Sequence, residues 1–335
     1  MGVQKIIKSF ALLLKDGFFH IFGASVINKI ISSAMSIILV WLLSKESFGA
    51  YSFAFNIISF FVLANGLGVS SAALQLCSEA DGLKKEHAIF NYAYKYGTAF
   101  DIALAFAVLT VGHFAPFSIN GSNTVLCLYC LLPLGMFLCD MTLCQLRVEL
   151  RNQEYAKATN IQTIFVAVLS LGGAFLFGAD GLAIMQSLAY FASWVMMRVI
   201  YFRKPSINMS NELMREHCDS VNKRDFWSIS IISALNNGIS QALTLVGTFL
   251  IGVLMANATD VATYKVATTI PYALLFIPAA IATYVYPKFA KNKDNASWTI
   301  KNYKRVMIAG TAIALLITVF FELFANPIVV LLFGA

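Results

Sequence analysis

Charged residues are scarce in this chain of 335 residues. Asp, Glu, Lys and Arg make up 12% of it, whereas soluble domains carry roughly 25%. Hydrophobic residues make up 59%, and the mean hydropathy is +0.74. The net charge of +7 does not indicate a nucleic-acid partner, because the basic residues are dispersed over short loops and form no continuous stripe. This composition predicts an all-α polytopic membrane protein.

Sequence features of enzymes and cofactor sites are also missing. No loop exceeds about 25 residues, which excludes a soluble catalytic domain, and neither a phosphate-binding P-loop nor a Gly-rich nucleotide fingerprint is present. The four histidines lack metal spacing. Cys127 and Cys130 form a C-x-x-C pair, but it lies in an apolar stretch without a second ligand pair outside it. We therefore expect no enzyme activity, no cofactor and no metal site.

Long apolar runs are what the chain does have. About 20 apolar residues cross the hydrocarbon core of a bilayer, and this length divides the chain into nine predicted spans. They lie near residues 18–43, 48–76, 91–115, 124–146, 161–178, 181–201, 226–255, 262–287 and 306–332.

Positive charge is strongly biased between the two sets of loops. Of the 24 Lys and Arg residues, 19 fall in the amino-terminal arm and the even-numbered loops, one (Lys45) falls in an odd-numbered loop, and four lie inside spans. Positive charge near span ends sets the orientation of a membrane protein. We therefore expect a cytoplasmic amino terminus and, after nine spans, a carboxyl terminus outside.

The longest loop and an internal repeat divide the spans into two lobes. The mixed-charge segment 202–225 reads as a cytoplasmic linker between an amino-terminal lobe, residues 1–201 with an amphipathic arm and spans one to six, and a partial second lobe, residues 226–335. An offset of 213 residues lays spans seven to nine over spans one to three with the same orientation, which indicates a parallel repeat. The matching residues are Tyr51 and Tyr264, Ala54 and Ala267, and Ile57 and Ile270.

The repeat leaves three spans without counterparts. The same offset maps residue 335 to position 122, so the counterparts of spans four to six are missing. We therefore expect these nine spans to belong to a twelve-span protein whose carboxyl-terminal part is truncated.

Four motifs resemble a known family. The first outer turn reads Leu-Ser-Lys-Glu-Ser-Phe-Gly-Ala-Tyr at 43–51, and Gly-Leu-Gly at 66–68, Tyr-Pro-Lys at 286–288 and Leu-Phe-Gly at 332–334 follow. These are similar to motifs of Wzx-type oligosaccharide flippases, in the polysaccharide transporter family of the MATE-like superfamily. Many relatives carry an acidic residue midway along span seven, where residues 241–248 of this chain hold none.

The resemblance implies a MATE-like two-lobe bundle in the bacterial inner membrane. It implies that the chain flips a polyprenyl-pyrophosphate-linked oligosaccharide repeat unit for O-antigen or capsule, by alternating access around a polar cavity. Membrane lipid, and a polymerase and chain-length regulator of the same pathway, are the implied partners. Two alternatives stay open: a MATE-type cation-coupled exporter of small molecules, and a membrane-embedded polysaccharide polymerase or glycosyltransferase.

Basic and amide side chains inside spans are the candidates for binding the substrate, since each buried charge is costly in a bilayer. Lys29 lies about 16 Å into span one, near mid-depth, where it could attract an anion or could pair with a carboxylate. Gln241 falls opposite Asn28 in the repeat and shares a helix face with Asn237. Lys265, near the outer end of span eight, is a weaker candidate.

Two carboxyl groups and two prolines complete the predicted site. Asp101 could carry a coupling proton or sodium ion, or could pair with Lys29, and Asp140 is a second candidate for ion coupling. Pro271 and Pro278 lie seven residues apart on one face of span eight, where they make either a hinge or a fixed kink.

Overall fold

Helices make up the regular structure of the described part of the chain. The computed structural model describes residues 18–80, 82–202, 222–274 and 296–333, which form two compact units, Met1–Lys265 and Val266–Ala335. Within these ranges every regular element is helical, and seven stretches are long and apolar enough to cross a membrane. They are Gly23–Leu42, Lys45–Ser78, Leu83–Phe114, Ser122–Val148, Asn152–Tyr201, Lys223–Met255 and Ser297–Phe324.

The first turn lies where the sequence predicts it. Helix α2 (Phe18–Leu42) ends just before Ser44, whose hydroxyl accepts the backbone N–H of Ser47 and caps α3 (Lys45–Val62). A serine in this position satisfies one of the free N–H groups at a helix start. The predicted amphipathic arm, residues 1–17, lies outside the described residues.

The second candidate span is broken inside the apolar region. After α3 the chain forms the short 3₁₀ turn η1 (Asn65–Gly68) and then α4 (Val69–Ser78). Gly66, Leu67 and Gly68 all have positive φ, at 54°, 49° and 75°. Glycine adopts this left-handed backbone without strain, which explains why two of the three residues are glycine.

The next helices extend further than their apolar cores. Helix α5 (Leu83–Phe114) begins well before the predicted residue 91 and so includes Lys84 and Lys85. It is followed by α6 (Ser122–Leu128) and α7 (Leu132–Val148), which are separated by a short turn. Pro133 stands in the first turn of α7, where its missing N–H costs nothing.

Helix α8 (Asn152–Tyr201) is a hairpin of two limbs. Its backbone leaves the helical region at Phe177 and Gly178, where the sequence predicts the end of one span and the start of the next. A Cβ on Gly173 would overlap the backbone of Gly181, so the limbs touch closely near the bend. At their other ends, the guanidinium of Arg151 donates to the carbonyl of Tyr201 at 3.1 Å.

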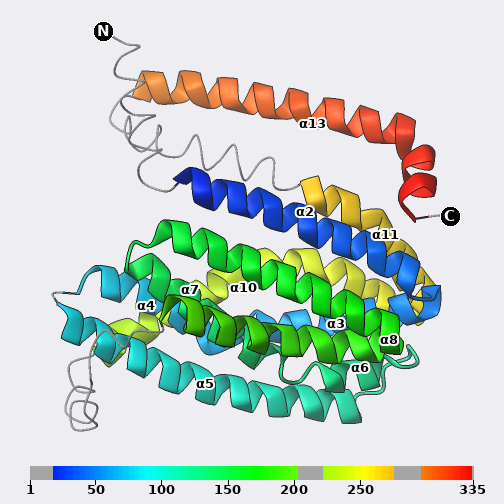
Figure 1. The fold of residues 1–335 in the computed structure, drawn as a ribbon. Coiled ribbons are helices and arrows are strands. Elements are labelled where there is room, and N and C mark those ends of the chain that lie inside the picture. The colour runs from blue at the N-terminus through cyan, green and yellow to red at the C-terminus, as the bar shows by residue number, and fades with distance from the viewer. Residues whose placement is uncertain (1–17, 81, 203–221, 275–295, 334–335) are drawn as a thin grey trace. The chain divides into compact units, whose positions relative to one another are not determined.

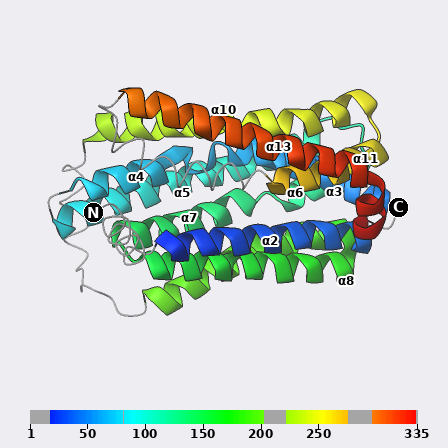
Figure 2. The ribbon, with the colours of Figure 1, turned by 90° about the horizontal axis from the view of Figure 1, so that it is seen from above.

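Two groups of contacts organise the first unit (Figures 1 and 2). Helix α2 packs mainly against α8, which also packs against α7. Helix α10 (Lys223–Met255) packs against α3, η1 and α4. The core where α4, α5, α7 and α10 meet contains Tyr92, Phe137 and Phe226, and the indole of Trp227 donates to the hydroxyl of Tyr92 at 3.0 Å.

Two further helices complete the described chain. Helix α11 (Ala258–Leu274) contains Pro271 and passes from the first unit into the second, and α13 (Ala296–Phe333) lies in the second unit. Pro278, most of the linker 202–225 and residues 275–287 of the eighth predicted span lie outside the described residues. The two-lobe division therefore stays a prediction.

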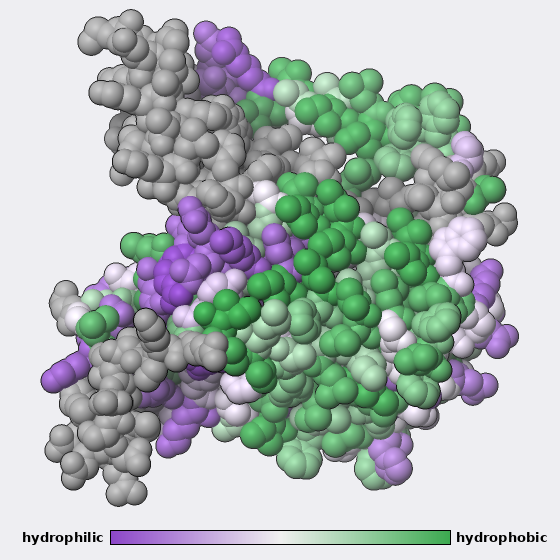
Figure 3. Space-filling model, in the orientation of Figure 1, coloured by the Kyte–Doolittle hydropathy of each residue, from purple (hydrophilic) through white to green (hydrophobic). Residues whose placement is uncertain are grey.

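The two ends of the helices in the first unit differ in their basic residues. The turns at 78–83 and 148–152 lie at one end, and those at 42–45 and 114–122 lie at the other (Figure 1). Lys84, Lys85 and Arg151 all belong to the first end, whereas Lys45 belongs to the second. Between the ends the visible surface is mostly apolar (Figure 3). This is the surface that a membrane-spanning bundle requires.

Candidate functional site

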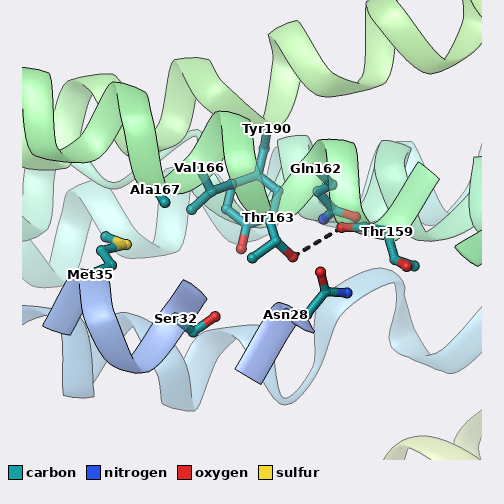
Figure 4. Close-up of a pocket in the computed structure, with 9 residues that line it drawn as sticks. All are labelled: Asn28, Ser32, Met35, Thr159, Gln162, Thr163, Val166, Ala167 and Tyr190. Atoms are coloured by element: carbon teal, nitrogen blue, oxygen red, sulfur yellow. Dashed lines mark hydrogen bonds between the residues drawn. The ribbon is translucent and has the colours of Figure 1, made fainter. Parts of the chain in front are cut away.

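A polar pocket lies between α2 and α8 in the first unit (Figure 4). Helix α2 contributes Asn28, Ser32 and Met35, which recur on one face at helical spacing. The first limb of α8 contributes five residues that lie along one of its faces, and the second limb contributes Tyr190. The residues from the first limb are Thr159, Gln162, Thr163, Val166 and Ala167.

The pocket offers hydrogen bonds without a formal charge. Its volume is about 260 Å³, and six of its nine lining residues carry a hydroxyl or amide group. The side-chain oxygen of Asn28 is buried and has no hydrogen-bond partner, while the hydroxyl of Thr163 donates to the Thr159 carbonyl at 3.0 Å. A buried amide oxygen without a partner is costly, so the pocket has an acceptor for a ligand's hydroxyl or for water.

Lys29 lies next to the pocket but does not line it. The lining residues that α2 contributes are Asn28, Ser32 and Met35, and Lys29 follows Asn28 at about 100° around the helix. Lys29 is half-buried on α2, and the ion pairs among the described residues belong to Arg151 with Glu149 and Glu154. The pairing of Lys29 with Asp101, one of the alternatives from the sequence, is therefore not formed.

Asp101 contacts the broken span instead. Its side chain is fully buried near the middle of α5, and its Oδ1 accepts the backbone N–H of Gly66 at 2.9 Å. Its Oδ2 has no hydrogen-bond partner. Asp140 is exposed on α7 and lies within electrostatic range of both Asp101 and Tyr190. The two acidic candidates thus interact electrostatically with each other, and Asp140 also interacts with Tyr190, which lines the pocket.

The remaining candidates do not line the pocket. Asn237 and Gln241 are exposed on α10, a helix that packs against α3, η1 and α4 and does not line the cavity. Lys265 is half-buried on α11, and Pro271 is exposed within the same helix.

Most of the residues that line the pocket were not among the candidates from the sequence. Asn28 is the one lining residue that was a candidate. Ser32 follows it by four residues, and Thr159 and Thr163 are also four apart. Polar residues at this spacing within apolar spans were a usable signal, because they share a helix face. That the polar faces of α2 and α8 meet at one pocket could not be inferred, because this depends on which helices pack together.

Comparison with known proteins places the chain among membrane transporters in fold. A family model described as polysaccharide biosynthesis protein matches residues 38–335. A multidrug resistance MATE family transporter of the MOP superfamily, solved in an outward-facing conformation, shares 18% identity with a TM-score of 0.61, and the alignment covers 94% of this chain and 73% of that one. A MOP superfamily transporter from Pyrococcus furiosus gives 18% identity, a TM-score of 0.60 and the same coverage. The Pyrococcus structure is described as having a binding pocket of reversed polarity that suggests a different function.

Sequence comparison with curated proteins gives no significant match. At 18% identity the two solved structures show the fold alone, an all-helical bundle of MATE-like type. Together with the apolar helices, this fold makes the chain a multi-pass membrane protein.

Proposed function

The chain belongs to the polysaccharide biosynthesis protein family, and on that premise we propose that it flips a polyprenyl-pyrophosphate-linked oligosaccharide across the bacterial inner membrane. The observation that carries the proposal is the uncharged, hydroxyl- and amide-lined pocket between α2 and α8. Sugar hydroxyls both donate and accept hydrogen bonds, so they match this lining. A repeat unit of O-antigen or capsule is the cargo that we propose.

The size of the pocket limits what it holds at one time. Pockets for drug-sized ligands measure about 300–1,000 Å³, and this one measures about 260 Å³. We therefore assign it to a single sugar ring of the repeat unit. The pyrophosphate lies outside the pocket in this proposal, where Lys29 of α2 is the candidate cation, and the lipid tail stays in the membrane.

Topology and movement follow from the same proposal. The basic ends of α5 and α8 face the cytoplasm, the predicted spans divide into two lobes, and the lobes alternate access to the pocket. Asn237, Gln241 and Lys265 are second-lobe contacts for the cargo, and the prolines of span eight allow bending. A polymerase and a chain-length regulator receive the flipped unit.

A MATE-type exporter of organic cations is the second candidate, since a solved relative in fold is a multidrug transporter. A cationic drug would be favoured by a carboxylate in the pocket, and the nine lining residues include none. The lining therefore favours the neutral sugar.

A complementation assay tests the proposal. The gene, with variants, is expressed in a bacterial strain that lacks its own flippase, and surface polysaccharide is measured at equal protein level. Gln162→Leu and Thr163→Val each remove hydrogen bonds worth about 1 kcal/mol, so we expect roughly fivefold weaker cargo binding and a matching loss of polymer. Thr110→Val is the matched control, because Thr110 makes the same bond to its own helix on the exposed face of α5.

Lys29→Ala is compared with Lys95→Ala, whose side chain is exposed on α5. We expect polymer to be lost in the first variant and kept in the second. Normal polymer in Gln162→Leu, Thr163→Val and Lys29→Ala, with normal protein levels, would refute the proposed cargo site.

A further inference from the structure

The break between α3 and α4 is built around one buried carboxyl group. Gly97 and Asp101 share a face of α5, and the Phe137 ring of α7 packs where a Cβ on Gly66 or on Gly97 would lie. From α10, the hydroxyl of Ser230 donates to the Leu67 carbonyl at 2.6 Å. Three helices thus hold the left-handed turn against Asp101.

Two buried oxygens at this break have no hydrogen-bond donor. One is Oδ2 of Asp101, whose other oxygen accepts the Gly66 N–H, and the second is Oδ1 of Asn65, the residue that begins the turn. Among the described residues no cation pairs with Asp101. A fully buried, ionised carboxylate with a single N–H donor would carry a large desolvation cost.

The ionisable group that interacts with Asp101 from the surrounding elements is itself acidic. Helices α3, α4, α6 and α7 and the turn η1 pack against α5, helix α10 packs against that turn, and Asp140 of α7 is the ionisable group among them that interacts with Asp101. The other ionisable residues of these elements are Lys45, Glu46, Tyr51, Cys77, Cys127, Cys139, Cys144, Arg147, Lys223, Arg224 and Asp225. Two neighbouring carboxyl groups that lack a cation tend to keep a proton between them.

We propose that Asp101 is a proton site: its Oδ2 carries a proton in this conformation, and Asp140 is the neighbouring carboxyl group that receives the proton when Asp101 releases it. The proton comes from hydronium, adds to a carboxylate oxygen and leaves as hydronium, so no redox partner is needed. Protonation gives the Asp101 carboxyl group an O–H donor, and the side-chain oxygen of Asn65 is an acceptor without a partner at the same break. The site does not depend on which cargo the protein carries.

Loss of the proton would act on the broken span. The ionised Asp101 needs further hydrogen-bond donors, and these become available when water enters the break or when the α3–α4 junction rearranges. Proton occupancy is therefore coupled to the geometry of this junction. Broken helices beside a polar cavity are where transporters tolerate such changes of backbone.

Infrared difference spectroscopy of the full chain in lipid nanodiscs tests the proton site. Aspartate is labelled with ¹³C at the carboxyl carbon, and the buffer contains choline chloride without sodium. We expect a protonated-carboxyl band at neutral pH that Asp101→Asn abolishes. Asp140→Asn should keep the band and move its titration to lower pH, because the neighbouring negative charge is gone. Asp180→Asn, at the exposed turn of α8, should leave both unchanged.

Three outcomes would overturn the proposal. The first is the persistence of the neutral-pH band in folded Asp101→Asn protein. The second is the replacement of that band by a carboxylate band when sodium replaces choline at fixed pH, which would make the site a sodium site. The third is a band that does not move in Asn65→Leu, the variant that provides the further check should Asp101→Asn fail to fold. Asn65→Leu removes the acceptor for the Asp101 proton, so the band should move to the frequency of a carboxylic acid without a hydrogen bond.

Discussion

Substituting Gly68 by alanine tests the left-handed turn in the second span most directly. Gly68 has φ of 75°, a conformation that costs a residue with a Cβ roughly 1–2 kcal/mol. The new Cβ would also overlap the carbonyl oxygen of Ser230 and lie 3.1 Å from the Cβ of Ala234, both on α10. Overpacking of this kind typically costs a further 1–3 kcal/mol. We therefore expect Gly68→Ala to lower the free energy of unfolding by about 2–5 kcal/mol.

Gly121→Ala separates the two contributions to this loss. Gly121 has φ of 82°, but a Cβ there would meet nothing within 4 Å. This variant should therefore lose only the conformational part, about 1–2 kcal/mol. The measurement is unfolding of the purified protein in mixed detergent micelles, followed by tryptophan fluorescence. Equal losses in the two variants would refute the close approach of α10 to the broken span, and no loss in either would refute the left-handed backbone itself.

The remaining predictions use the same unfolding measurement. Ser230→Ala removes the hydrogen bond to the Leu67 carbonyl and should lower the free energy of unfolding by about 1 kcal/mol. Ser240 is exposed on the same helix, so Ser240→Ala should cause no measurable loss. Equal effects of the two variants would contradict the contact between Ser230 and the broken span. Gly173→Ala should cost about 1–3 kcal/mol because its Cβ would overlap Gly181 in the other limb of α8. Gly172→Ala meets open space and should stabilise the helix by up to about 1 kcal/mol, so a loss there would count against the hairpin contact.

Span positions could be predicted from the sequence because apolar length is a local property. The predicted turns near residues 44 and 179 agree with the start of α3 at Lys45 and the bend of α8 at Gly178. The helix boundaries show the 213-residue offset of the predicted repeat as well. Helix α2 ends at Leu42 and α10 at Met255, while α3 begins at Lys45 and α11 at Ala258, and both pairs differ by 213 residues.

Features that depend on packing could not be predicted. Gly-Leu-Gly at 66–68 was visible as a motif, but its left-handed backbone depends on Asp101 and Ser230, which are distant in sequence. For the same reason the sequence left open whether Asp101 pairs with Lys29, and the structure gives it the Gly66 N–H instead. A charge inside a span indicates that a partner exists, but which partner it is depends on the helices that pack together.

Tyr190 links the polar pocket electrostatically with the carboxyl pair. It lines the pocket from the second limb of α8, and it lies within electrostatic range of Asp140, which in turn interacts with Asp101. Coupling between two sites is reciprocal: if cargo in the pocket changes the affinity for the proton, the proton changes the affinity for cargo by the same factor. If the cargo is a sugar, as proposed, a sugar hydroxyl that engages the Tyr190 phenol acts on a group that interacts electrostatically with Asp140. The two proposals together therefore predict that binding of the sugar is linked to binding of the proton at Asp101.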